Sequence, residues 1–263
     1  MMTELLLPDI KATALALLIH FRDFCQENNI RFYLSNGTLL GAVKYGGFIP
    51  WDDDVDVFVP RGDYDRLLKI YQNTDRYQLF SPDREPAYRY PFAKLCDMTT
   101  LKVEANVDNG VQLGLDVDIF PLDTCSGHIL KFNVMTRIKA YLLGCSLSKF
   151  VSVEGKPFYK RCIIGCCRVL GFGFFHRRLL GLVRKESLRG KGYMGCLMWP
   201  IYGEREIIPA EVFSEAVEVE FEGERFPAPA GYDTYLRSVY GEYEIDPPLE
   251  KQKSHHQYRA FSL

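Results

Sequence analysis

A run of aspartates near residue 50 has the spacing of a divalent cation site. Residues 52–54 are aspartate, and Asp56 follows Val55. The alternation of aspartate and valine predicts a strand over residues 54–59, with Asp54 and Asp56 on one face. Carboxylates two residues apart lie roughly 7 Å apart along a strand. Their side chains can therefore converge on Mg²⁺, which takes oxygen ligands and binds phosphates beside them.

A glycine-bearing turn precedes this acidic strand. Residues 35–41 read Ser-Asn-Gly-Thr-Leu-Leu-Gly, which predicts a turn at Asn36-Gly37 after a short strand over residues 30–34. Thr38 can cap the short helix that follows, and the first N–H groups of that helix would then face an anion. A turn that offers N–H groups to a phosphate, beside a strand that holds a metal, is typical of a nucleotidyl or phosphoryl transferase.

A second alternating segment supplies the third carboxylate. Residues 114–120 predict a strand with Asp116 and Asp118 on one face, and Pro121 is expected to end it. Two aspartates on one strand and one on its neighbour make the usual polymerase-β-like arrangement, which favours Asp118 as the third member. Asp116 lies on the same face and is the alternative.

The rest of the chain must supply the elements that position these residues. Its 263 residues are 47% hydrophobic and 25% charged, the composition of a soluble globular protein, and no apolar run is long enough to span a membrane. The periodicity predicts an α+β protein. Helices are expected over residues 8–28, 62–73 and 232–240, strands over 77–80, 90–96 and 100–104, and a hairpin over 217–226.

A basic block lies in the second half of the chain. Residues 130–191 carry 14 Lys and Arg and only two acidic residues, although the whole chain has a net charge of −2. The apolar content of this region predicts a helical insertion over residues 126–200 of a single transferase domain that spans 1–263. Two interpretations remain open. In the first, the block is a helical cap that packs on the core, and the stems of Lys and Arg cover apolar surface. In the second, the block lies on an anionic membrane face.

Eight cysteines are expected to be reduced thiols, mostly in the core. Glu4 and Asp9 lie where a secretory signal needs positive charge, so we expect a cytoplasmic protein, in contact with the inner face of the cell membrane if the basic block binds there. Cys162, Cys166 and Cys167 could hold zinc, but their spacing fits no standard ligand pair.

Four blocks of the sequence resemble the signature of the LicD family. That family comprises cholinephosphotransferases of bacterial surface glycans and is related to fukutin and the fukutin-related ribitol-phosphate transferases. The most specific match is Pro-Trp-Asp-Asp-Asp-x-Asp at residues 50–56. The chain departs from the family's usual glycine at Asn36 and from its Arg-His at Lys44 and Tyr45. The four blocks are residues 37–43, 47–57, 60–64 and 116–123, and parts of the tail over 240–256 are similar as well.

The resemblance implies a polymerase-β-like nucleotidyltransferase fold, with a mixed sheet flanked by helices, and a CDP-activated donor, typically CDP-choline. Phosphocholine would pass to a hydroxyl of a cell-surface glycan of the lipopolysaccharide or teichoic acid type, with release of CMP. Phosphoryl transfer needs charge neutralisation and alignment more than covalent help. Asp54 and Asp56 would hold Mg²⁺ or Mn²⁺, and Asp118 would share a metal, accept the acceptor's proton, or both.

Further residues are candidates for donor binding. The N–H groups around Gly37, Thr38 and Gly41 would bind a donor phosphate. Lys94, in a predicted strand, either contacts a phosphate or lies at the surface, and Trp51 either stacks on a base or caps the core. We expect a small-molecule nucleotide donor and a glycan acceptor, lipid-linked if the basic block binds membrane, and no nucleic acid.

Three functions compete on these residues. The first is transfer of phosphocholine, or of another phospho-alcohol such as ribitol phosphate or phosphoethanolamine, which releases CMP. The second is a nucleotidyltransferase that moves NMP from an NTP and releases pyrophosphate. The third is a non-catalytic membrane-surface binding module that uses the basic block, and the complete set of carboxylates argues against it.

Overall fold

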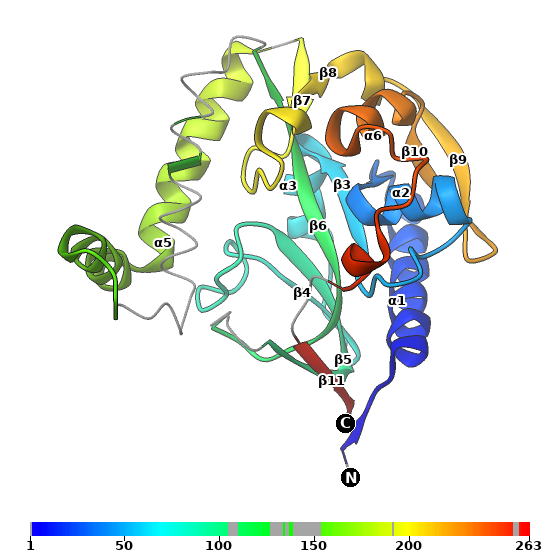
Figure 1. The fold of residues 1–263 in the computed structure, drawn as a ribbon, viewed down its shortest axis with the longest axis horizontal. Helices are drawn as coiled ribbons and strands as arrows, with labels where there is room; N and C mark the ends of the chain where they lie inside the picture. The colour runs from blue at the N-terminus through cyan, green and yellow to red at the C-terminus, as the bar shows by residue number, and fades with distance from the viewer. Residues whose placement is uncertain are drawn as a thin grey trace.

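A mixed β-sheet with helices packed on it organises the protein (Figure 1). The computed structural model describes residues 2–104, 110–126, 134, 137–138, 154–190, 192–254 and 258–263. Within these residues the main sheet has nine strands, and its central path runs β1-β11-β5-β6-β3-β2. The expected α+β class with a mixed sheet flanked by helices is therefore confirmed.

The central strands carry the aspartates of the predicted site. β5 (Ala93–Glu104) pairs antiparallel with β6 (Leu113–Cys125), and β6 pairs parallel with β3 (Asp56–Pro60). β2 (Tyr33–Leu34) lies antiparallel to β3. The other strands of this sheet are β1 (Thr3–Glu4), β4 (Tyr77–Phe80), β7 (Tyr193–Gly195), β8 (Ile208–Pro209) and β11 (Tyr258–Ser262).

Four helices pack near these strands. α1 (Leu7–Glu27) lies against β5 and β6, and its apolar residues are buried at the predicted helical spacing. α2 (Asn36–Tyr45) contacts β3, α3 (Arg61–Ile70) follows β3 directly, and α6 (Tyr232–Tyr240) has its predicted bounds. The buried residues of α1 are Ile10, Ala14, Leu17, Leu18, Phe21 and Cys25.

A separate hairpin joins β9 (Ala216–Phe221) to β10 (Glu224–Pro229). Its two turn residues, Glu222 and Gly223, both have positive φ, at 53° and 78°. This is the combination that matches the twist of two-residue hairpins. The hairpin predicted over residues 217–226 is therefore confirmed, with β10 extending three residues further.

Several predicted strand boundaries are wrong, and β2 keeps only Tyr33–Leu34 of the strand predicted over residues 30–34. β3 begins at Asp56 rather than at Asp54, so Asp54 lies in the segment before the strand. The predicted strands over 90–96 and 100–104 are parts of the single strand β5, which begins only at Ala93 and has an irregular register between Asp97 and Lys102. β6 continues past Pro121, which lies opposite Val59, because a proline removes only its own N–H from the ladder.

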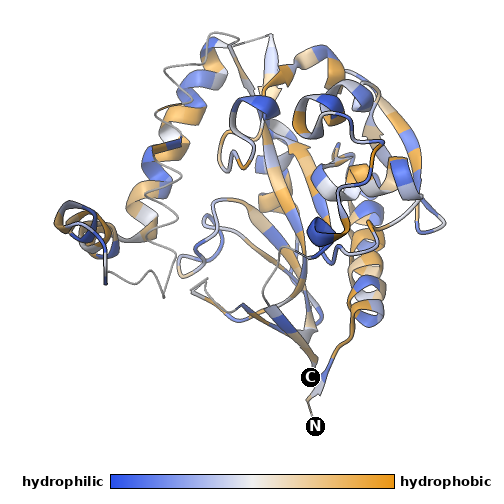
Figure 2. Ribbon diagram, viewed as in Figure 1, coloured by the Kyte–Doolittle hydropathy of each residue, from blue (hydrophilic) through white to orange (hydrophobic). Residues whose placement is uncertain are grey.

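One long helix accounts for much of the basic block. α5 (Phe158–Arg189) contacts β6, and Figure 2 shows hydrophobic and hydrophilic bands alternating along it. Gly171 interrupts the helix with φ 70° and ψ 169°, a conformation that glycine adopts readily. A second apolar cluster, which includes Phe175, Leu179 and Val183, lies under its C-terminal half. Residues 127–133, 135–136, 139–153 and 191 of the predicted insertion lie outside the described residues.

Candidate active site

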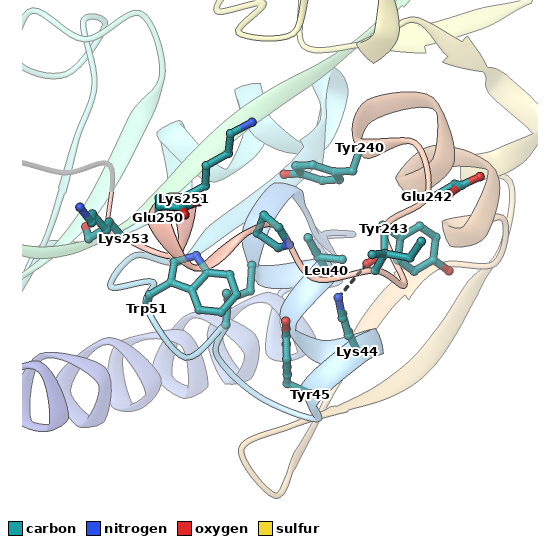
Figure 3. A pocket seen from close by; sticks show the side chains of 14 residues that line it. Leu40, Lys44, Tyr45, Trp51, Tyr240, Glu242, Tyr243, Glu250, Lys251 and Lys253 are labelled. Atoms are coloured by element: carbon teal, nitrogen blue, oxygen red, sulfur yellow. Dashed lines mark hydrogen bonds between the residues drawn. The ribbon is translucent and has the colours of Figure 1, made fainter.

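The carboxylates gather where β3 begins and β6 runs beside it. In the parallel pairing of these strands Asp56 lies opposite Asp118. A pocket of about 290 Å³ is lined by Asp52, Asp54 and Asp56 and by the first residues of α2. Trp51, which also lines this pocket, contributes to a second, larger pocket next to it (Figure 3). The lining residues of the smaller pocket are Asn36, Gly37, Ile49, Trp51, Asp52, Asp54, Asp56, Ile201, Tyr202 and Tyr240.

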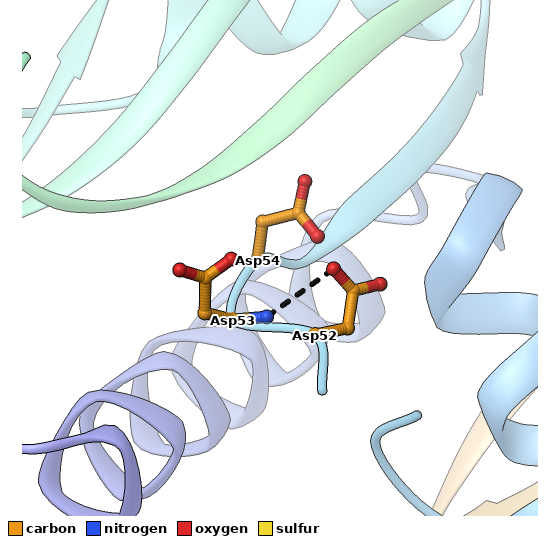
Figure 4. A group of neighbouring side chains, drawn as sticks. All are labelled: Asp52, Asp53 and Asp54. Atoms are coloured by element: carbon orange, nitrogen blue, oxygen red, sulfur yellow. Dashed lines mark hydrogen bonds between the residues drawn. The ribbon is translucent and has the colours of Figure 1, made fainter. Parts of the chain in front are cut away.

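Three consecutive aspartates form a compact cluster just before β3 (Figure 4). Asp52, Asp53 and Asp54 each offer an oxygen, and these oxygens all lie within 4.8 Å of one another. The segment is held in place because the Asp52 N–H donates to the Ile49 carbonyl at 2.9 Å. Among the described residues, the oxygens of Asp52, Asp53 and Asp54 lie close enough together to share one metal ion by this distance. The oxygens of the expected set, Asp54, Asp56 and Asp118, do not. Sequence reasoning did not select Asp52 or Asp53 as ligands.

Asp56 is buried beside other carboxylates. Its exposed fraction is 9%. Burial raises its pKa well above the ordinary value, and the negative charges of Asp54, Asp118 and Asp52 raise it further. The Asp56 N–H donates to Thr38 Oγ1 at 2.8 Å, which fixes the start of β3 against α2. A cation in the pocket would relieve this repulsion and favour the charged carboxylate.

Asp118 and Asp116 are distinguished by their lysine partners. Lys94 Nζ donates to Asp118 and, at 3.2 Å, to Asp116, while Lys102 Nζ donates to Asp116 at 3.0 Å. Burial raises the pKa of Asp118 to about 6, although Lys94 opposes this rise. In Asp116 the effect of burial is outweighed by Lys102 and Lys94, which hold the pKa below its ordinary value. Asp116 is thus neutralised by two lysines and Asp118 by a shared one.

Lys94 lies in the interior of the protein. Its side chain is 3% exposed, and β5 pairs it with Asp118 of β6 in register. Burial would lower the pKa of Lys94, but Asp116 and Asp118 outweigh this and raise it. The interpretation of Lys94 as a surface lysine is therefore wrong, and its ammonium is already engaged by two carboxylates.

The first turn of α2 forms one wall of the pocket. The helix begins at Asn36 after the N-cap Ser35, whose buried Oγ has no hydrogen-bond partner among the described residues. The expected cap at Thr38 is wrong, because Thr38 lies inside the first turn and its hydroxyl accepts the Asp56 N–H instead. A Cβ at Gly37 would lie 2.6 Å from Asp52 Oδ2, so glycine lets the carboxylate approach the helix.

Gly41 serves a different purpose from Gly37. A Cβ at Gly41 would lie 2.4 Å from the Gly47 carbonyl oxygen. The absence of a side chain therefore lets the backbone around Gly47 pack directly on α2. The packing of Gly41 against Gly47 does not test its expected role in binding a donor phosphate, and that role stays a prediction.

Two residues that were not selected from the sequence, Asn36 and Tyr235, hold the Asp56 side chain through hydrogen bonds. The Tyr235 hydroxyl donates to Asn36 Oδ1 at 2.8 Å, and the Asn36 side chain is hydrogen-bonded to Asp56, which partly offsets the rise in its pKa. Asn36 has a φ of 45°, a region that asparagine tolerates better than most residues. The sequence offered one indication that Asn36 has a special role, because asparagine stands there in place of the family's usual glycine.

The donor set of this pocket suits a hard divalent cation. Asp52, Asp53 and Asp54 offer oxygens close together, and the pKa of Asp56 is raised by burial and then by the neighbouring carboxylates. Mg²⁺ and Mn²⁺ prefer such oxygen ligands. By contrast, Cys162 and Cys166 are exposed, and the described residues include no cluster of metal-ligating side chains around them.

No helix in the described part of the chain combines the length and apolarity that a membrane span requires.

Residues 29–142 match the family model described as LicD/FKTN/FKRP, nucleotidyltransferase domain. The chain is also similar along its whole length to the lipopolysaccharide cholinephosphotransferase LicD of Haemophilus influenzae, with 29% identity over 268 residues that cover 100% of both proteins.

Two partial similarities concern proteins with other names. Mannosyltransferase regulator 4 of Saccharomyces cerevisiae is 30% identical over 113 residues, which are 40% of this chain and 9% of that protein. An uncharacterized protein of Rickettsia prowazekii is 34% identical over 77 residues, which are 29% of this chain and 27% of that protein. The resemblance seen in the sequence motifs is confirmed, because residues 29–142 match the family model described as LicD/FKTN/FKRP, nucleotidyltransferase domain, and the whole chain is similar to a protein named LicD.

Proposed function

We propose that this protein transfers phosphocholine from CDP-choline to a hydroxyl of a cell-surface glycan of the lipopolysaccharide or teichoic acid type and releases CMP. The observation that most supports this is the carboxylate pocket with the buried Asp56 at its base. It occurs in a chain similar over its full length to a protein named a lipopolysaccharide cholinephosphotransferase. A polymerase-β-like topology is part of the same proposal.

Asp54 and Asp56 would hold the divalent cation, and Asp52 lies close enough to contribute. When bound, Mg²⁺ supplies positive charge that neutralises the diphosphate and the developing charge on the leaving group. The protein's part is to keep these carboxylates close together in spite of their repulsion. The hydrogen bonds from Asn36 to Asp56 and from the Asp56 N–H to Thr38 support that arrangement.

The donor phosphates would lie at the first turn of α2. The first N–H groups of a helix have no partner within the helix and attract anions, and Gly37 and Thr38 lie in that turn beside the carboxylate pocket. Lys94 adds positive charge behind Asp118. The Lys94 ammonium has three N–H groups, of which two are directed at Asp116 and Asp118, so a direct contact with a phosphate would use the third.

Asp118 would accept the proton of the attacking hydroxyl. Its pKa of about 6 suits a general base near neutral pH. The lysine beside it lets the carboxylate ionise in spite of burial. Asp116 is less suited to this role because its pKa is held low by Lys102 and Lys94.

The exposed side of α5 would rest on an anionic membrane surface, where a lipid-linked acceptor is presented. Phe158, Val169 and Leu188 are 79%, 87% and 85% exposed, respectively. Basic residues near a membrane surface each contribute about 1 kcal/mol of binding, and exposed apolar side chains can enter the headgroup region. The exposed basic residues of α5 are Lys160, Arg161, Arg168, Arg177, Arg178, Arg184, Lys185 and Arg189.

A comparison of donors tests the reaction. The purified chain is incubated with Mg²⁺, a soluble glycan acceptor and, in separate reactions, CDP-choline, CDP-ethanolamine, CDP-ribitol or CTP, and both CMP and pyrophosphate are measured. We expect CMP from CDP-choline together with a phosphocholine-bearing glycan. Pyrophosphate from CTP would favour the nucleotidyltransferase alternative. The absence of both CMP and pyrophosphate would favour the non-catalytic membrane module.

A further inference from the structure

A second pocket adjoins the carboxylate pocket and has a different chemical character. It has a volume of about 920 Å³ and lies between α2, the segment before β3 and the C-terminal segment 240–254 (Figure 3). Ile49, Trp51 and Tyr240 line both pockets. A ligand held by the carboxylates at one end can therefore extend past these side chains into the larger space.

Trp51 and three tyrosines line this second pocket, and the tyrosine hydroxyl groups form hydrogen bonds with other side chains. The Tyr45 hydroxyl is hydrogen-bonded to Asp246, and the Tyr243 hydroxyl donates to Asp233 Oδ1 at 2.8 Å. The Tyr240 hydroxyl accepts a hydrogen bond from Tyr202 at 3.4 Å. The rings consequently offer the pocket π surface more than hydrogen-bonding groups. This suits a ligand group that cannot donate a hydrogen bond.

The wall of the pocket already holds one cation over an aromatic ring. Lys44 Nζ lies 5.4 Å from the centroid of the Tyr45 ring and forms an ion pair with Asp246. The Trp51 ring lies edge-on to Tyr45, with 6.4 Å between centroids, at the boundary of the two pockets. The other charged residues that line the pocket balance in number, because Glu242 and Glu250 carry two negative charges and Lys251 and Lys253 two positive ones. Any preference for a cation would therefore come from the rings rather than from net charge.

We propose that this pocket is the subsite for the quaternary ammonium end of the donor, with Trp51 and Tyr240 as the residues that recognise it. The inference rests on the proposed function. In phosphocholine the nitrogen lies two carbons from the phosphate oxygen, so a phosphate bound at the carboxylates brings the ammonium to the shared boundary of the two pockets. Aromatic faces are the established chemical means of binding a quaternary ammonium, which has no N–H to offer.

A binding experiment tests the subsite without using activity. The chain contains two tryptophans, so Trp199→Phe leaves Trp51 as the sole tryptophan, whose emission can be excited selectively at wavelengths that tyrosine does not absorb. In that variant, with Mg²⁺ present, phosphocholine should change the Trp51 emission and bind about 3- to 30-fold more tightly than phosphoethanolamine, the range expected for a cation–π contact. CMP should not compete. Equal affinity of the two phospho-alcohols, or a Trp51 response to CMP that phosphocholine cannot displace, would overturn the proposal.

Kinetic variants separate the subsite from the reaction. In Trp51→Leu and Tyr240→Leu the KM for CDP-choline should rise about 3- to 30-fold, with less than a twofold change for CDP-ethanolamine. Tyr159→Leu, an exposed tyrosine of α5, is the matched control. If Tyr240→Leu does not fold, Trp51→Leu alone decides. An equal loss for both donors would refute the subsite and leave the reaction standing. Failure to consume any CDP-alcohol would refute the reaction, and the Trp51 titration would still decide the subsite.

Discussion

Replacing Asp56 by asparagine should stabilise the metal-free protein while abolishing its activity. The carboxylate is buried and its pKa is raised by burial and by the charges of Asp54, Asp118 and Asp52. The folded state therefore holds the Asp56 proton more tightly than the unfolded chain. Its stability falls as the pH rises above about 4, the ordinary value for aspartate. Asparagine keeps the shape and the acceptor oxygen but removes this charge.

The size of the effect follows from the spacing of the strands. Asp56 and Asp118 are register partners on adjacent strands, which lie about 4.8 Å apart. Two unit charges about 5 Å apart repel by about 3 kcal/mol at an effective dielectric constant of 20. Lys94 reduces this repulsion, and Asp54 and Asp52 add to it. We therefore expect Asp56→Asn to raise the free energy of unfolding by about 1–3 kcal/mol at pH 8 without divalent cations.

Urea unfolding in EDTA at pH 5 and pH 8 measures this change, with Asp116→Asn as the matched control. Asp116 is also a buried aspartate of the central sheet, but it is paired with Lys94 and Lys102. Its replacement should lower the free energy of unfolding by about 3–5 kcal/mol, because it leaves buried ammonium groups without their partner. The reasoning is refuted if both variants lose stability to the same extent, or if Asp56→Asn retains more than about one hundredth of the activity.

Three further predictions concern other parts of the molecule. Asp118→Asn should lower the rate of CMP release roughly 10²–10⁴-fold with little change in calorimetric CDP-choline affinity, and normal turnover would shift the role of base to Asp116. Burial raises the pKa of Glu206 to about 8, so the native state loses stability as the pH rises from about 4.5 to 8, by up to about 1.4 kcal/mol per pH unit. Glu206→Gln should flatten this dependence in urea unfolding, and an unchanged slope would contradict the assignment. Neutralising four exposed basic residues of α5 should weaken sedimentation with anionic vesicles at low salt and slow transfer to a lipid-linked acceptor, but spare transfer to a soluble sugar. If the wild-type protein does not sediment with such vesicles, the membrane proposal is wrong. The four residues are Arg177, Arg178, Arg184 and Lys185, each changed to Gln.

Local patterns in the sequence were enough to predict the elements around the site. The apolar spacing of α1, the positions of α6 and β4 and the turn at Glu222-Gly223 all depend on residues close together in the chain. The alternation around Asp56 and Asp118 also indicated two strands that could be neighbours, which their register confirms. The motifs at residues 37–64 and 116–123 also indicated the similarity to the family model, which matches residues 29–142.

Contacts between distant segments could not be predicted in this way. Tyr235 reaches Asn36 across 199 positions of the chain, and no local pattern links the two. The burial of Lys94 depends on β5 lying beside β6, which places its ammonium between two aspartates. The compact cluster of Asp52, Asp53 and Asp54 includes Asp54 because this residue lies in the segment before β3, and not in the strand that its alternation with valine predicted.

The most direct test of the central proposal is the release of CMP from CDP-choline by the purified chain in the presence of a glycan acceptor. The account predicts release with Mg²⁺ or Mn²⁺, none with EDTA, recovery when the cation is restored, and none in Asp54→Ala. The matched control Asp23→Ala, which changes an exposed aspartate of α1, should behave like the wild type. CMP release that persists in EDTA, or in a folded Asp54→Ala variant, would contradict the proposal that the carboxylate pocket carries a metal-dependent phosphocholine transfer.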